Sequence, residues 1–142
     1  MRNHLILIKK KIMKEFMLLI RNKINHQDEW TNERLQEFLK KCEVYILNLK
    51  NNGKLISAQP LIREGKIISG KSGAWKVESF NENDEVQVGY YHIFAKDMEE
   101  AISIVKDNPE FEYGSSARIE VRPIKTKEVA TNFVYPKTTI ST

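Results

Sequence analysis

The segment from Val86 to Pro109 constrains the fold more than any other part of the sequence, because it joins a strand pattern directly to a helix pattern. Residues 86–95 are rich in aromatic and β-branched side chains that alternate between two faces, which predicts a strand. Asp97-Met98-Glu99-Glu100 then forms a capping box, in which the first and last side chains accept from free backbone donors at a helix start. The pair Asn108-Pro109 predicts the end of that helix. We therefore expect a domain that mixes strands and helices.

The first part of the chain shows the same order of a strand and a helix. Residues 15–21 form a nearly continuous apolar run, which predicts a central strand buried on both faces. A helix is expected from Thr31, whose hydroxyl suits an N-cap, to Leu49, because apolar residues recur there every three or four positions. Gly53, just after this segment, is typical of a helix end.

Short strands complete the predicted pattern. Residues 54–57 and 117–121 each predict one strand, and residues 66–69 and 75–79 predict a hairpin because glycines lie between them. The order is then strand, helix, strand, inserted hairpin, strand, helix, strand. This is the split β-α-β pattern of a ferredoxin-like α+β sandwich, with two helices on one face of an antiparallel sheet.

The second face of this sheet is expected to need cover from another molecule. Alternation places Tyr90, His92 and Phe94 on one face of their strand, and that row is too apolar to lie fully in water. A symmetric homodimer is the simplest cover, and two such sheets packed face to face would enclose a cleft.

The positive charge of the chain lies at its start. The formal net charge is +4, and residues 1–12 contain Arg2 and three lysines but no acid, so the remaining residues are electrically balanced. A balanced body does not predict a phosphate-binding surface, and we expect no nucleic-acid partner.

We divide the chain into a basic leader outside the core (residues 1–12), a ferredoxin-like domain (residues 13–125) and a C-terminal tail (residues 126–142).

Cysteine and histidine usage excludes several kinds of site. Cys42 is the single cysteine, so an intrachain disulfide and a zinc site built on cysteine pairs are both excluded. His4 and His26 lie far apart in sequence and context, so we expect no metal and no cofactor.

The leader lacks the long apolar run and small-residue cleavage site of a secretory signal, and no segment resembles a membrane span. A cytoplasmic protein without a membrane partner is expected.

Five short blocks follow one another along the chain: Met13-Lys14-Glu15-Phe16-Met17-Leu18-Leu19, Asn52-Gly53-Lys54-Leu55, Gly89-Tyr90-Tyr91, Asp97-Met98-Glu99-Glu100-Ala101 and Ile119-Glu120-Val121-Arg122-Pro123-Ile124. In order and spacing they resemble the YciI-like or DGPF-domain proteins of the YCII-related family, over about residues 13–124. The resemblance implies a ferredoxin-like dimeric α/β barrel in a small, bacterial, cytoplasmic protein.

Two departures from the family pattern bear on function. The Asp-Gly-Pro-Phe motif is present only as Val77-Glu78-Ser79-Phe80, so the geometry given by its glycine and proline is lost. In members suspected of enzymatic activity, a histidine on the first helix pairs with an aspartate in the next segment. That histidine position falls at Cys42 here, and no aspartate lies near Gln59-Pro60-Leu61. The resemblance therefore does not carry an enzymatic dyad to this chain.

The candidate site residues come from the sheet and the hairpin. His92 has a pKa range suited to acid–base chemistry, and the alternative is a hydrogen-bonded packing residue. Arg122, with Glu120 on the same strand, could bind a carboxylate through its guanidinium, and the alternative is a surface ion pair. Tyr90 and Trp75 could stack on a flat ligand, although core or interface packing is also expected of aromatic residues.

Two functional hypotheses follow. The first is a small ligand-binding or regulatory homodimer whose cleft on the sheet face binds a small anionic or aromatic ligand through Tyr90, Glu120, Arg122 and Trp75, without turnover. The second is a small-molecule isomerase or lyase, with His92 as general base and Arg122 holding an anionic substrate. The missing dyad favours the first hypothesis.

Overall fold

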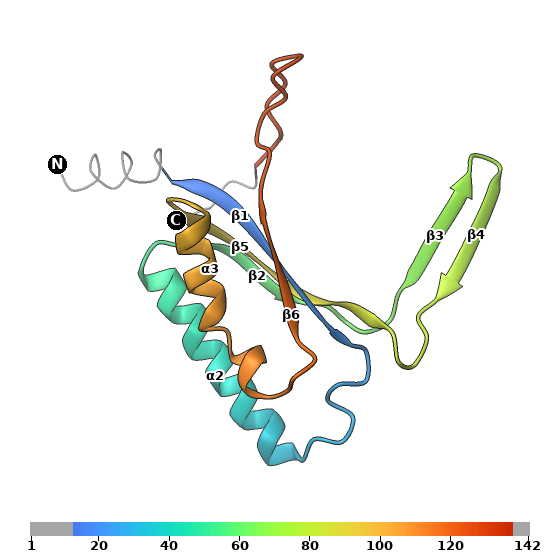
Figure 1. Ribbon diagram of the computed structural model, residues 1–142, viewed down its shortest axis with the longest axis vertical. Helices are drawn as coiled ribbons and strands as arrows, with labels where there is room; N and C mark the ends of the chain where they lie inside the picture. Colours follow the sequence, from blue (N-terminus) through green and yellow to red (C-terminus); the bar gives the residue numbers. More distant parts are fainter. Residues whose placement is uncertain (1–12, 138–142) are drawn as a thin grey trace.

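The computed structural model of the protein describes residues 13–137, in which one layer of helices packs on one face of a sheet (Figure 1). The elements in chain order are β1 (Lys14–Lys23), α2 (Asn32–Asn51), β2 (Leu55–Pro60), β3 (Lys66–Lys71), β4 (Ala74–Ser79), β5 (Glu85–Ala95), α3 (Met98–Lys106), the 3-10 helix η1 (Pro109–Glu112) and β6 (Arg118–Pro123). The main sheet has the order β2-β5-β1-β6 with antiparallel neighbours, and β3 pairs only with β4. This topology confirms the predicted ferredoxin-like fold with an inserted hairpin. The sheet stays open, with β2 and β6 at its edges, and the predicted leader lies outside the described residues.

The hydrophobic core lies between the sheet and the two helices. On β1, Phe16, Leu18 and Ile20 point toward the helices and are buried, and they pack with residues of β5 such as Ile93. Full burial of a side chain of this size contributes about 1.5–3 kcal/mol to folding. The prediction that β1 is buried on both faces is wrong, because its alternate residues are only half-buried. Both helices lie on the same side of the sheet and leave the other side without a second layer (Figure 1).

The strand-to-helix unit of the second half forms as the sequence predicts. Strand β5 begins one residue earlier than expected and ends at Ala95, and Asp97 accepts a hydrogen bond from the backbone N–H of Glu100 at 2.9 Å. Alternation along β5 places Tyr91 in the core and His92 on the face that the helices do not cover. The helices thus cover the face of β5 that carries Tyr91 and leave the face that carries His92 open.

Helix α2 begins and ends at its predicted signals. The hydroxyl of Thr31 accepts from the backbone N–H of Arg34 at 3.2 Å. After the helix, Gly53 adopts a φ of +69°, which is a left-handed conformation that glycine takes without steric cost. The buried side of the helix carries Phe38, Tyr45 and Leu49 against the sheet.

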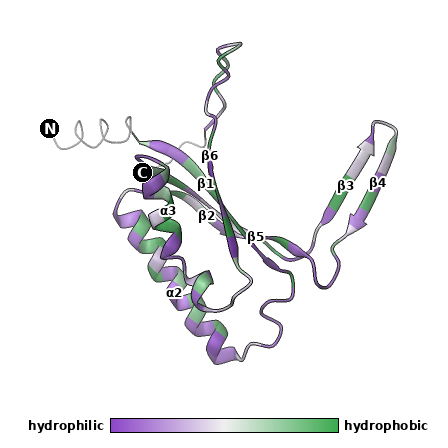
Figure 2. Ribbon diagram, viewed as in Figure 1, coloured by the Kyte–Doolittle hydropathy of each residue, from purple (hydrophilic) through white to green (hydrophobic). Residues whose placement is uncertain are grey.

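The hairpin of β3 and β4 forms an arm that stands away from the main sheet (Figure 1). Every residue of both strands is exposed. The register pairs Ile68 with Val77 and Gly70 with Trp75, so Ile68, Val77 and Trp75 share one face of the arm. Figure 2 shows apolar stretches along this otherwise polar arm. A two-stranded hairpin with an uncovered apolar face is only marginally stable in water.

The segment after β6 continues along β1 and then folds back on itself. The backbone N–H of Ile124 donates to the carbonyl of Glu15 at 3.0 Å, and Lys127 and Val134 form an isolated antiparallel bridge. Lys137 then lies 2.6 Å from the carboxylate of Glu15. The described part of the predicted tail therefore forms a narrow hairpin that stands away from the main sheet (Figure 1), and its two ends lie near Glu15 of β1.

Candidate functional site

The sheet face opposite the helices holds four of the five residues predicted for the site. The register places them in two adjacent rows across the sheet: Tyr90, Leu19 and Glu120 in one, and His92, Met17 and Arg122 in the other. Adjacent strands lie about 4.8 Å apart, so the outer residues of each row are about 10 Å apart at the backbone. That span fits a small flat ligand lying across β1. We call these two rows the sheet-face site.

A partner that the sequence analysis missed holds His92 in place. The Nε2 atom of His92 lies 2.9 Å from Oε1 of Glu15, whose side chain is only 8% exposed. Because a carboxylate accepts hydrogen bonds, Nε2 is the donor, and in a neutral ring Nδ1 is left as the basic atom. Glu15 and His92 are diagonal neighbours on β1 and β5, so the pairing of these two strands was the signal that could have revealed the contact.

Ion pairs organise the other side of the sheet-face site. Arg122 Nη1 lies 3.1 Å from Glu120 Oε2, and Arg21 of β1 lies 3.9 Å from the other oxygen of that carboxylate. A second ion pair lies nearby, in which Arg118 of β6 donates twice to Glu85 of β5, at 2.8 and 2.9 Å. The guanidinium of Arg122 is largely exposed, so it remains accessible to an anionic group.

Trp75 does not join the rows. It lies on β4, in the separate two-stranded sheet, and its side chain is 63% exposed. Within one chain, therefore, the structure brings together Tyr90, His92, Glu120 and Arg122 but not Trp75.

Most of the chain matches one known domain family. Residues 14–125 match the YCII-related domain family. The chain belongs to this family. A search of curated proteins found no match. In the described residues of this YCII-related protein, no helix is long and apolar enough to cross a membrane, and no three histidine, cysteine or acidic side chains are grouped as metal ligands would be.

The position at which a YCII-related dyad would place its histidine lies on the helix side of the sheet. Cys42 lines a cavity of about 260 Å³ between α2 and strands β2 and β5, together with Gln59 and Pro60. Burial raises the pKa of the Cys42 thiol to about 12, so at neutral pH the thiol is protonated and is not a nucleophile.

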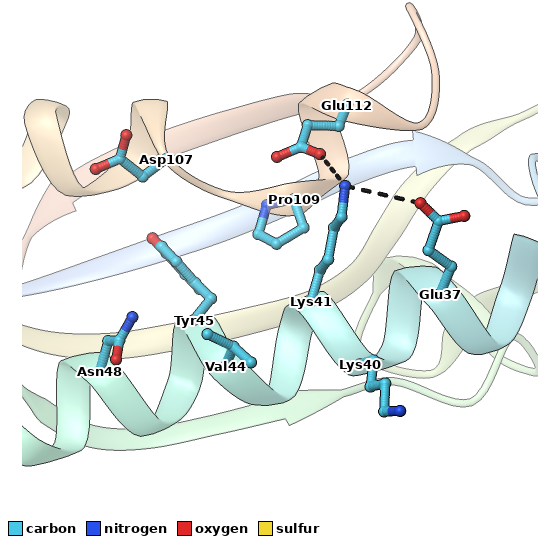
Figure 3. Close-up of a pocket in the computed structure, with 9 residues that line it drawn as sticks. All are labelled: Glu37, Lys40, Lys41, Val44, Tyr45, Asn48, Asp107, Pro109 and Glu112. Carbon is cyan, nitrogen blue, oxygen red and sulfur yellow. Dashed lines mark hydrogen bonds and ion pairs between the residues drawn. The ribbon is translucent and has the colours of Figure 1, made fainter.

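A larger surface groove lies between α2 and the segment from α3 to η1 (Figure 3). Its volume is about 710 Å³, but its main polar groups already have partners within the chain. Lys41 Nζ lies 2.7 Å from Glu112 and 3.8 Å from Glu37, and the hydroxyl of Tyr45 donates to the carbonyl of Ile104 at 2.7 Å. We therefore assign these contacts to the packing of the two helical segments.

Proposed function

We propose that this YCII-related protein is a ligand-binding homodimer, located in the cytoplasm, that binds a small aromatic acid on the sheet-face site without turnover. The observation that carries the proposal is the pair of rows that place His92 and Tyr90 across β1 from Arg122 and Glu120. An exposed guanidinium suits a carboxylate, and an aromatic side chain on the same face suits a flat ring.

The surface of the sheet supports the homodimer. Met17, Leu19 and Phe94 are half-buried apolar side chains on a face that no second layer of the same chain covers. The arm adds a second uncovered apolar surface, formed by Ile68, Trp75 and Val77. A second copy placed face to face would bury both kinds of surface and would form the other wall of the cleft.

The hydrogen bond between His92 and Glu15 favours a second candidate function. A carboxylate that orients an imidazole and leaves its other nitrogen basic is the arrangement used by general bases. The alternative is therefore an isomerase or lyase in which Nδ1 of His92 takes a proton from an anionic substrate held by Arg122. We rank it second, because Cys42 stands where the family's dyad would place its histidine.

A thermal-shift titration with benzoate and 4-hydroxybenzoate tests the binding proposal. Both acids should raise the melting temperature of the full chain, and Arg122→Ala should weaken that effect about tenfold or more in concentration. Arg118→Ala is the matched control, because it removes an exposed arginine from the same strand. A shift that Arg122→Ala and His92→Ala leave unchanged would remove these residues from the site.

A further inference from the structure

The cavity on the helix side of the sheet has a composition that selects for positive charge. Its apolar wall includes Phe38 and Leu39 of α2 and Tyr91 of β5. Among the described residues that line it, two are acidic, Glu43 and Glu110, and none is basic. Aromatic rings and carboxylates are the groups that proteins use to bind organic cations. The cavity lies on the opposite side of the sheet from the sheet-face site, so the two sites are independent.

Glu110 is the acidic group buried in this wall. It lies on η1, where Asn108 accepts from its backbone N–H at 2.9 Å, and its side chain is only 12% exposed. Burial raises the pKa of its carboxyl, and the hydrogen bond from Asn22 and the nearby cationic Arg63 only partly oppose that effect. Among the described residues, its one direct donor is the side-chain amide of Asn22, at a long 3.5 Å. The carboxyl thus retains acceptor capacity that the described part of the chain does not use.

The amide of Asn22 is held in the orientation that faces Glu110. Its Oδ1 accepts from the hydroxyl of Ser116 at 2.6 Å and from the backbone N–H of Lys23 at 2.9 Å. An amide oxygen that accepts two hydrogen bonds fixes the direction of the NH₂ group on the other side. Glu110 is therefore supported from β1 and does not move freely.

A second acceptor without a donor faces the same carboxyl. Nδ1 of His26 lies 2.8 Å from the carbonyl of Lys23, and since a carbonyl only accepts, Nδ1 carries the proton. Nε2 then presents a lone pair, has no hydrogen-bond partner among the described residues and lies 3.9 Å from Oε2 of Glu110. The His26 side chain is only 7% exposed, and burial lowers its pKa and keeps the ring neutral. A buried acceptor without a partner carries a free-energy penalty of about 1–3 kcal/mol.

We propose that the cavity binds a small primary amine with an apolar body, and that the ammonium group binds to Glu110 close to His26. The ammonium has three donors and no acceptor, which matches the acceptor oxygens of Glu110 in the cavity wall; His26 neighbours this carboxyl but is not one of the residues that line the cavity. The apolar body lies between Phe38 and Tyr91, whose rings also favour a nearby cation. An anionic ligand is disfavoured by the two acidic residues, and a purely apolar ligand would leave the acceptor oxygens of Glu110 without a new donor.

Benzylamine and its neutral analogue benzyl alcohol are the probes. Isothermal titration calorimetry on the full wild-type chain measures the binding of each probe directly. Benzylamine should bind, and the dissociation constant of benzyl alcohol should be about tenfold higher or more. Equal affinities of the two probes, or no binding of benzylamine, would overturn the proposal without any variant.

Substitution of Glu110 then locates the ammonium group. Glu110→Gln should weaken benzylamine binding about tenfold or more, whereas Glu112→Gln, which changes an exposed glutamate on the same turn, should leave it unchanged. His92→Ala should also have no effect, which separates this site from the sheet-face site. Benzylamine binding that survives Glu110→Gln in full would contradict the proposal, and if that variant does not fold, the comparison of the two probes on the wild-type chain decides.

Discussion

The imidazole of His92 and the carboxylate of Glu15 form a half-buried hydrogen bond of 2.9 Å between two central strands. It lies on the sheet face that the helices leave open, and it orients the one histidine in the row of site residues. Both side chains are at least partly buried, so removal of one partner should have a measurable consequence.

We predict that Glu15→Ala destabilises the chain by about 1–3 kcal/mol, because it leaves a partly buried imidazole without its partner and also removes the contact between Glu15 and Lys137. Urea unfolding of the variant measures the effect. Glu82→Ala, which changes an exposed residue in the turn before β5, is the control and should change the free energy of unfolding by less than about 0.5 kcal/mol. Equal stability of the two variants would show that the His92–Glu15 contact contributes nothing.

Substitutions on the apolar face of the arm should weaken dimerisation more than a substitution on its other face. Changing both Ile68 and Val77 to serine should weaken dimerisation, because it removes apolar area from the one apolar face of the arm. Ile67→Ser, on the opposite face, is the matched control and should have a much smaller effect. Sedimentation velocity over a range of concentrations measures both. Equal effects of the two changes would contradict a specific role for this face.

The buried carboxyl of Glu110 should make the free energy of unfolding depend on pH. Burial raises the pKa of its carboxyl above the ordinary value of 4.5, so protonation favours the folded state. The stability that this group contributes is full below pH 4.5 and is lost as the pH rises through the folded-state pKa. The stability of the wild type relative to Glu110→Gln should therefore fall as the pH is raised from 4 toward 8 in denaturant titrations. A difference that stays constant with pH would contradict this assignment.

The backbone of β2 approaches Gly89 of β5 closely. A Cβ atom at this position would lie 3.1 Å from the carbonyl oxygen of Gln59 on β2, within the sheet. Gly89→Ala should therefore destabilise the fold by about 1–3 kcal/mol, as measured by thermal unfolding. Gly114→Ala is the control, because no atom lies within 4 Å of its Cβ position. A stable Gly89→Ala variant would show that β2 can move away from β5.

Local signals in the sequence predicted most of the fold. The caps at Thr31 and Asp97, the glycine after α2 and the alternation along β5 each act within a few residues, so they can be recognised without knowledge of the tertiary structure. The two-sided burial expected of β1 was wrong because an apolar run does not reveal how many layers cover a sheet.

The sites were less accessible to prediction, because their partners lie far apart in the sequence. Glu15 and His92 are 77 residues apart, and only the pairing of β1 with β5 brings them together. His26 and Glu110 are also distant, and neither lies in a recognisable motif. The rows of the sheet-face site were predictable in part, since alternation alone placed Tyr90 and His92 on one face.

Sedimentation equilibrium of the full wild-type chain tests the central claim most directly, because the proposed cleft needs a second copy for its other wall. The account predicts a species of twice the chain mass of 16.6 kDa at micromolar concentration, and benzoate should strengthen its association. A monomer at all concentrations, with or without benzoate, would contradict the account.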